Sequence, residues 1–300
     1  MLAAGANSTS SVLQRKANQS EPDSLSLSPR LILDLFHRPV WFTGLLAVIV
    51  GFLLQAAALA HGELAVVEPL LVLELPFTLV LATVVFRKGL HRREWTAAGA
   101  MTAGLILLIA SLSPHGGSAR QVPATTWALA TAASVAAICF LVAAARTSRG
   151  SRRAALLGVA TGTTFGLTAS LMTAMSEQLA AGLGAVLTTW QTYAMVVTGI
   201  SAMFLLQSAL QAGTLVAVQP GLTLTDPVVS ILWGTVVFHE QVHAGPWVVA
   251  AVAGAGLILA GTISLSRSSL LSDKAGASAG GDGRRRQAQA RAPAREAEQP

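Results

Sequence analysis

The chain alternates between long apolar segments and short polar ones. Apolar runs that are nearly free of charge cover eight ranges: 39–60, 64–86, 95–113, 126–145, 155–176, 186–210, 214–238 and 246–265. Each run comes close to the roughly 20 residues with which a helix crosses a bilayer core of about 30 Å. A large soluble α-helical protein buries some apolar helices, but eight such runs in one chain favour an all-α integral membrane protein.

Residues 1–17 form a further, shorter apolar segment that ends at Arg15 and Lys16. The segment lacks a basic amino-terminal region and has only a weak apolar centre, so it does not resemble a signal peptide. We interpret it as the end of one more span, which is either shortened or continued upstream of Met1. With it, the sequence predicts about nine transmembrane helices.

Composition agrees with a membrane protein and narrows the choice of partners. Hydrophobic residues make up 53% of the chain and charged residues 11%, whereas a soluble domain carries about 25% charged residues. The net charge of +6 comes from loops and the carboxyl-terminal tail, so it implies no nucleic-acid partner. We expect the lipid bilayer and a small molecule or cation as partners, together with a possible homodimer.

The sequence shows no motif for a cofactor or for catalysis. Its single cysteine, Cys139, cannot form an internal disulfide, and no phosphate-binding loop is present. His239 and His243 are four residues apart, but we interpret them as a loop pair rather than a metal site. An intramembrane enzyme would need a nucleophile and a base at depth, yet every histidine lies at or outside the end of a span. We therefore expect no enzyme and no cofactor.

Basic residues alternate from loop to loop, which predicts the orientation. Residues 15–38, 87–93 and 146–153 each carry four Lys or Arg, the tail from Ser266 carries seven, 114–125 carries one and the other loops none. Cytoplasmic loops hold the excess of positive charge. We therefore expect the plasma membrane, with the amino terminus outside and the carboxyl terminus cytoplasmic. The tail 267–300 has no apolar periodicity and is expected to be disordered.

Two segments about 151 residues apart are similar: EPLLVLELP, beginning at Glu68, and QPGLTLTDP, beginning at Gln219. Each contains two prolines seven residues apart, which are expected to break the helices: Pro69 and Pro76, then Pro220 and Pro227. The matching spans are five helices apart, so the second copy crosses in the opposite direction. We expect a first repeat over 1–113, a linker helix over 126–145 and a second repeat over 155–266, in a single transmembrane domain over 1–266.

Three acids lie inside the predicted spans: Glu68, Glu74 and Asp226. A charge at such depth costs roughly 2.5–3.5 kcal/mol on insertion scales, so each should face a cavity or be protonated. Gln219 and Asp226 are seven residues apart and share a helix face, with Thr223 close by, whereas Glu74 lies about 120° round the helix from Glu68.

These positions define the candidate site. Glu68, Asp226 and Gln219 are the first choices for binding a substrate or ion, followed by Glu74 and Thr223, and Gln55 and Gln207 recur as possible path-lining residues. In the alternative interpretation, the acids are neutral structural groups between packed helices and the prolines only kink the chain.

The chain also resembles the drug/metabolite transporter superfamily over roughly residues 1–266. The similarity is carried by Gln207, Ala209-Leu210, Gly213, Pro220, Pro227 and Phe238-His239-Glu240, followed by a Gly/Leu-rich last helix. Glu240 matches a Gly-Glu-like turn of that superfamily, where the first copy has Lys88. The nine-span arrangement is closest to the NIPA-like magnesium transporter and EamA-like branch. The resemblance implies a carrier, with magnesium or another divalent cation as one candidate substrate.

The sequence therefore favours a secondary transporter of a small metabolite or cation that works by alternating access, because repeat-built carriers place broken helices around a site at mid-membrane. The alternatives are a NIPA-type transporter of Mg²⁺ and a membrane scaffold that transports nothing.

Overall fold

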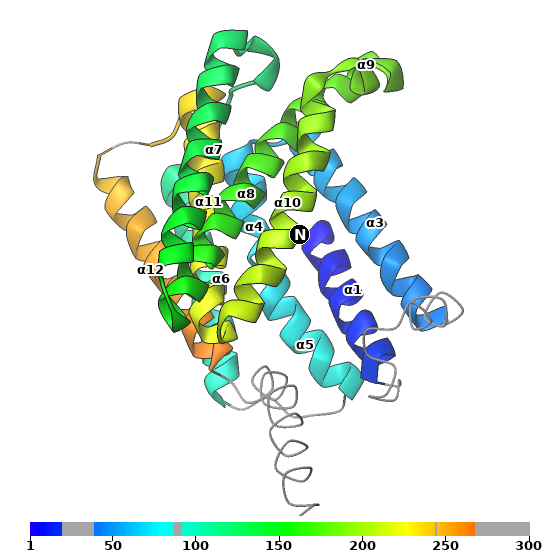
Figure 1. Ribbon diagram of the computed structural model, residues 1–300, viewed down its shortest axis with the longest axis vertical. Helices are drawn as coiled ribbons and strands as arrows, with labels where there is room; N and C mark the ends of the chain where they lie inside the picture. Colours follow the sequence, from blue (N-terminus) through cyan, green and yellow to red (C-terminus); the bar gives the residue numbers. More distant parts are fainter. Residues whose placement is uncertain (20–38, 87–91, 244, 268–300) are drawn as a thin grey trace, which may run out of the picture.

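Helices make up every long element of the computed structural model, which describes residues 1–19, 39–86, 92–243 and 245–267 (Figure 1). Within these residues, the one strand-like pairing is an isolated bridge between His115 and Gln241. The α-helices are α1 (Leu2–Gln19), α3 (Pro39–His61), α4 (Leu64–Leu71), α5 (Glu74–Phe86), α6 (Arg92–Leu112), α7 (Ala124–Thr147), α8 (Gly150–Gln178), α9 (Leu183–Thr188), α10 (Trp190–Ala212), α11 (Leu215–Leu232) and α12 (Pro246–Ser266).

Six segments of the described chain are long and apolar enough to cross a membrane: Leu64–Val85, Arg92–Leu112, Ala124–Thr147, Gly150–Gln178, Trp190–Ala212 and Pro246–Ser266. A shorter apolar helix covers Leu46–His61. The prediction of an all-α membrane protein is confirmed at this level. The predicted tail lies outside the described residues.

Three predicted runs are composite, and one of them, 64–86, divides into α4 and α5. The other two are interrupted near one end. The run 186–210 is interrupted at Thr189, whose extended backbone separates α9 from α10. The run 214–238 is α11 followed by a π-helical turn over Trp233–Val237. Both of these interruptions lie near the ends of the bundle, so the centre of each of these two runs is helical as predicted.

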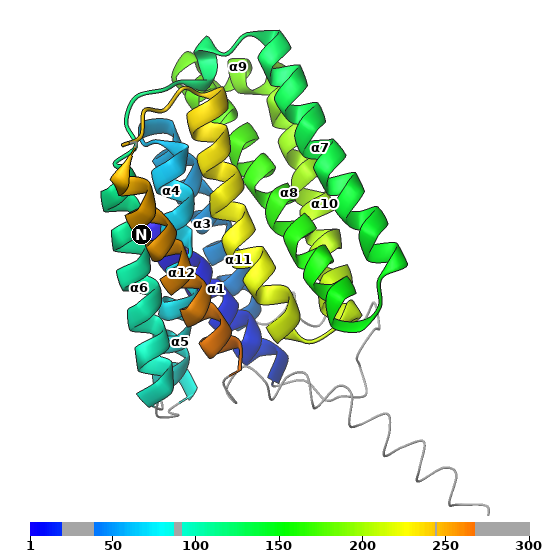
Figure 2. The same cartoon turned by 90° about the vertical axis from the view of Figure 1, so that its left-hand side faces the viewer.

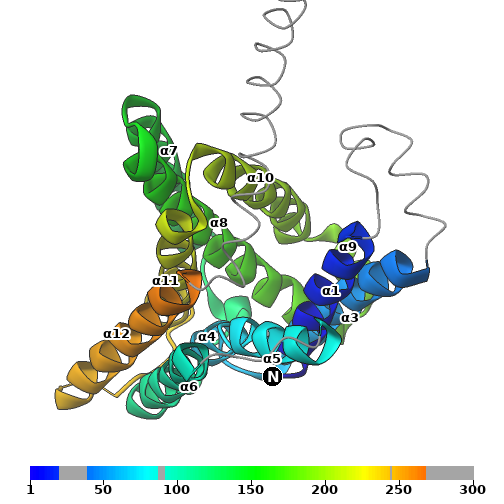
Figure 3. The same cartoon turned by 90° about the horizontal axis from the view of Figure 1, so that it is seen from below.

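The helices pack in the same order in the two halves of the chain. In the first half, α1 packs against α3 and α5, and in the second, α8 packs against α10 and α11. The halves meet where α6 lies along α12 and where α4 lies against α11. Seen from below, α6 and α12 run side by side, with α1 and α3 apart from α7 and α10 (Figure 3).

The central position belongs to α8, and α7 lies at the periphery (Figure 2). In the apolar window of α8, 72% of the residues are buried, against 6% in α7. The exposed surface of α7 is apolar, including Leu129, Val135 and Phe140. Apart from its contact with α8, this helix is suited to a lipid environment, where apolar side chains need no protein partner.

Acidic and basic loops lie at opposite ends of the bundle. At one end, Gly116 donates a hydrogen bond to Glu63, and Ser118 donates one to Glu177. We call this the capped end; it comprises residues 61–65, 113–121, 173–177 and 238–241. At the other, Arg93 donates a hydrogen bond to Ser264, near the last turn of α12. We call this the basic end.

Helices α6 and α12 are in very close contact. A Cβ atom at Gly254 would lie 2.6 Å from the carbonyl oxygen of Gly104, and one at Gly104 would lie 2.5 Å from the carbonyl oxygen of Gly254. Glycines let helix backbones approach one another in membranes. Only hydrogen fits at these two positions, so this pair sets the spacing between the two halves.

Gly254→Ala should lower the thermal unfolding midpoint of the detergent-solubilised protein, because overpacking costs about 1–3 kcal/mol. Gly256→Ala is the matched control in the same helix, since a Cβ atom there meets nothing within 4 Å. The control should leave the midpoint unchanged or raise it. Equal midpoints for the two variants would contradict the close packing of α6 on α12.

Candidate functional site

Of the two prolines expected to break the first repeat, Pro69 lies inside α4 without breaking it, whereas a break occurs just before Pro76. Proline lacks an N–H group, and its ring clashes with the carbonyl four residues earlier, which here belongs to Val72. The helix breaks at Val72–Leu73, where Leu75 N–H donates to the Val72 carbonyl over the shorter three-residue span. Pro76 itself lies in the first turn of α5, where proline is tolerated. Thus α4 is a separate helix of eight residues.

The corresponding break in the second repeat does not exist. Pro220 and Pro227 both lie inside α11, which runs without interruption from Leu215 to Leu232. Support comes from α8: a Cβ atom at Gly162 would lie 2.9 Å from the carbonyl oxygen of Leu222. Contact along the neighbouring backbone holds α11 in one piece, so the sequence-level expectation of a break in both copies is wrong for the second.

Glu68 lies at the centre of the candidate site. It is part of α4 and is 3% exposed. Gln55 of α3 donates a hydrogen bond from Nε2 to Glu68 Oε1 at 2.8 Å. A carboxylate removed from water needs such donors, so Gln55 holds the Glu68 side chain in place.

Asp226 of α11 is the second carboxylate of the site. It interacts electrostatically with Glu68, across the contact between α4 and α11. Its Oδ1 atom is buried and has no hydrogen-bond partner among the described residues. Buried polar atoms are nearly always paired, so this oxygen is a position where a proton, a cation or a polar ligand group can bind.

A polar stripe on α11 extends the site. Gln219 Nε2 donates to Thr223 Oγ1 at 3.2 Å, and both residues share a face with Asp226, as their spacing predicts. Ser230 lies four residues beyond Asp226, is fully buried, and its hydroxyl also has no partner in the described chain. Sequence analysis did not single out Ser230, although the spacing 219, 223, 226, 230 could have identified it.

Two other candidates lie elsewhere. Glu74 is the first residue of α5, where a carboxylate stabilises the amino-terminal end of a helix; it is half-buried and has an interaction partner. Gln207 is exposed on α10, opposite the face that carries the buried Leu205 and Ala209. Its offset from Gln55 is 152 residues rather than 151, and one residue of slip turns a helical side chain by about 100°. Gln207 is therefore placed away from Glu68, and its role as a path-lining residue stays a prediction.

Among the described residues, no group of three or more His, Cys, Asp or Glu side chains is placed to hold a metal ion. Mg²⁺ is often bound by one or two carboxylates while it keeps several waters. Glu68 and Asp226 could provide these one or two carboxylates, so a magnesium site would have to use this pair.

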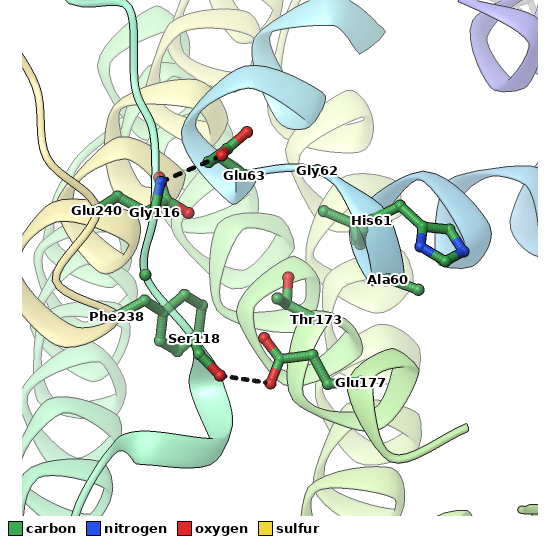
Figure 4. A pocket seen from close by; sticks show the side chains of 12 residues that line it. Ala60, His61, Gly62, Glu63, Gly116, Ser118, Thr173, Glu177, Phe238 and Glu240 are labelled. Carbon is green, nitrogen blue, oxygen red and sulfur yellow. Dashed lines mark hydrogen bonds between the residues drawn. The ribbon is translucent and has the colours of Figure 1, made fainter. Parts of the chain in front are cut away.

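A polar cavity with a volume of about 180 Å³ lies at the capped end, apart from Glu68 and Asp226 (Figure 4). Its wall contains three carboxylates, Glu63, Glu177 and Glu240, and each accepts hydrogen bonds from backbone N–H groups of a neighbouring segment. Local sequence could not reveal these contacts, because their donors lie 53 to 176 residues away along the chain.

Glu240 makes the longest-range of these contacts. Its carboxylate accepts hydrogen bonds from the N–H groups of Leu64 at 2.7 Å and Ala65 at 3.1 Å, the first residues of α4. Burial raises the pKa of Glu240 from 4.5 to about 7, although the two backbone donors oppose the shift. Gly234 and Gly117 leave room for its side chain.

Comparison with known proteins gives a relative but no function. The chain is 28% identical over 262 residues to an uncharacterized protein of Corynebacterium glutamicum, and the match covers 87% of this chain and 90% of the relative. No family model matches the chain, and no solved structure matches it.

Gln55→Leu should lower the thermal unfolding midpoint, since a hydrogen bond to a charged group is worth about 1.5–3 kcal/mol and Glu68 would be left buried without its donor. Gln207→Leu, the same change on an exposed face, is the control and should leave the midpoint within error of the wild type. A midpoint for Gln55→Leu equal to that of the control would show that the 2.8 Å contact contributes nothing.

Stability should also depend on pH through Glu240. The carboxyl group ionises at about pH 7 in the folded protein and near 4.5 when unfolded, so its contribution is complete below pH 4.5 and is lost as the pH rises through 7. The midpoint of the wild type minus that of Glu240→Gln should therefore decrease between pH 5 and pH 8. A difference that is constant or rises with pH would mean that the backbone donors outweigh burial.

Proposed function

We propose that this protein is a secondary membrane transporter of the drug/metabolite type, which moves a small metabolite or a cation by alternating access. The observation that carries the proposal is the buried Asp226 Oδ1 atom, without a partner in the described chain, beside Glu68. Ionisable groups inside a bundle are costly and mark substrate or ion paths. A membrane scaffold has no need of such a pair.

The proposed architecture is two inverted repeats and nine spans. Helices α1, α3, α4 with α5, and α6 correspond to α8, α10, α11 and α12, and α7 is the linker. The packing order, which is the same in both halves, supports this correspondence. The basic end would face the cytoplasm of the plasma membrane, because it carries the described loops rich in arginine, and the capped end would face outward.

The site lies at the junction of the proposed repeats. Glu68 comes from the first half and Asp226 from the second, and the interrupted helix α4–α5 is next to the continuous helix α11. Rocking of one half against the other would expose the pair first to one side of the membrane and then to the other. Two nearby carboxylates repel each other, so the site favours a cation, a cationic group or protons.

A transporter of Mg²⁺ is the second candidate, and the same two carboxylates favour it. Mg²⁺ needs few protein ligands, because it retains bound water. The polar stripe of Gln219, Thr223 and Ser230 offers neutral oxygen atoms along α11 that could receive hydrogen bonds from such waters. A metabolite with an amino group would use the same charges, so flux measurements must compare the two classes.

Reconstitution of the purified full-length protein in liposomes tests this proposal. We expect flux of at least one probe among Mg²⁺, protons coupled to amines, and amino acids. Asp226→Asn and Glu68→Gln should each reduce that flux about tenfold or more, since each removes a charge from the site while keeping its shape. Gln207→Leu, on the exposed face of α10, should transport as the wild type does.

Each result of the flux experiment has a clear meaning. Flux of Mg²⁺ alone would favour the magnesium hypothesis, and flux of amines or amino acids would favour a metabolite carrier. Equal flux in the wild type, Asp226→Asn and Glu68→Gln would show that the site is assigned wrongly. Absence of flux for every probe, with correctly folded protein, would favour the scaffold.

A further inference from the structure

The amino-terminal end of α4 is capped by the Glu240 side chain, which comes from the other half of the molecule. Glu240 is 6% exposed, and its two oxygen atoms accept the N–H groups of Leu64 and Ala65. The first N–H groups of a helix have no partner within the helix, so this carboxylate acts as its cap. Glu63, the residue at the usual capping position, makes no such bond.

The capped helix α4 also contains Glu68 of the candidate site. Glu68 lies one turn beyond Leu64 on α4, which has only eight residues and is separated from α5 at Val72–Leu73. A short segment with a break at one end and a cap at the other can move as a unit if the cap is released. Its counterpart α11 has no such freedom, because it is continuous.

An apolar layer lies directly beneath the cap. Leu59, Leu64, Ala169 and Phe238 are all less than 5% exposed and belong to one packed cluster. Leu59 and Phe238 also line the cavity of the capped end, and Figure 4 labels Phe238 there. Leu64, the amino-terminal residue of α4, belongs to this cluster and lies one helical turn before Glu68.

The remaining carboxylates hold loops rather than α4. Glu177 accepts hydrogen bonds from the hydroxyl of Ser118 and from the N–H groups of Ala119 and Arg120. Glu63 accepts one from the N–H group of Gly116. These contacts hold the segment 116–120 in place. Of the three carboxylates Glu63, Glu177 and Glu240, only Glu240 accepts hydrogen bonds from α4, the helix that contains Glu68.

We propose that the cap formed by Glu240 on α4 is a gate at the capped end. While the cap is in place, α4 and its apolar layer close the way from the capped-end cavity to Glu68, and release of the cap opens that way. The inference rests on the proposed function for its meaning in transport, but the gate itself can be detected without any substrate.

A cysteine beneath the cap reports the state of the gate. In full-length protein carrying Cys139→Ser, Ala169→Cys places a thiol in the apolar layer, and His61→Cys in a separate variant places one on the exposed rim of the cavity. A membrane-impermeant maleimide applied to intact cells, and separately to inverted vesicles, gives the labelling rate from each side.

Glu240→Ala, which removes the cap, should increase the rate at which Ala169→Cys is labelled from the capped end about tenfold or more. The labelling rate in Glu240→Gln should lie between that of Glu240→Ala and that of protein with Glu240. Glu240→Ala removes two hydrogen bonds from α4, which together shift an equilibrium by about that factor, and the amide of Gln keeps only one acceptor oxygen. Labelling of His61→Cys should not change. Glu240→Gln keeps the test usable if Glu240→Ala fails to fold.

Glu177→Ala is the matched control, because it removes three hydrogen bonds from the capped end and none from α4. It should leave labelling of Ala169→Cys slow. Equal acceleration by Glu177→Ala and Glu240→Ala would show general loosening and overturn the gate, as would unchanged labelling in both variants of Glu240. If labelling is faster but no probe is transported, the gate is supported and the proposed transport function is contradicted. If flux depends on Asp226 but labelling is unchanged, the transport function is supported and the gate is overturned.

Discussion

The burial of two carboxylates at the contact between α4 and α11 is the constraint around which this bundle is organised. A charged group costs free energy in a low-dielectric interior unless it is paired or neutralised. Gln55 satisfies part of this need at Glu68, while Asp226 Oδ1 is left without a partner in the described chain. The helices around the pair are closely packed, α6 on α12 and α8 on α11.

Hydrogen-bonded carboxylates have a different task at the capped end. Glu63, Glu177 and Glu240 satisfy backbone N–H groups of segments that are distant in sequence, so each acid links two parts of the chain. These links and the apolar layer below them close the bundle on that side. The two groups of acids are connected through α4, since the helix capped by Glu240 carries Glu68 one turn later. The backbone groups that Glu240 caps and the carboxyl group of Glu68 are thus parts of the same short helix, α4.

The two copies of the internal similarity have diverged where the structure uses them differently. Pro76 breaks its helix at Val72, four residues earlier, while α8 supports α11 through both Pro220 and Pro227. Gln55 donates a hydrogen bond to Glu68. Gln207 is offset by one residue from the equivalent position, so its side chain lies on the exposed face of α10. The similarity thus predicts where polar residues recur along the chain, but the partners of each helix decide which copy contributes to the site.

Sequence by itself determined the helical class, the apolar segments and the acids that lie within them, because these follow from local composition and helical periodicity. It also identified the face shared by Gln219, Thr223 and Asp226, which depends only on spacing within one helix. Only the tertiary structure decided that Glu68 and Asp226 meet, that Pro220 leaves α11 intact, and that Glu240 caps α4 from 176 residues away. Contacts between distant segments depend on how whole helices pack, and no local pattern of residues encodes that arrangement.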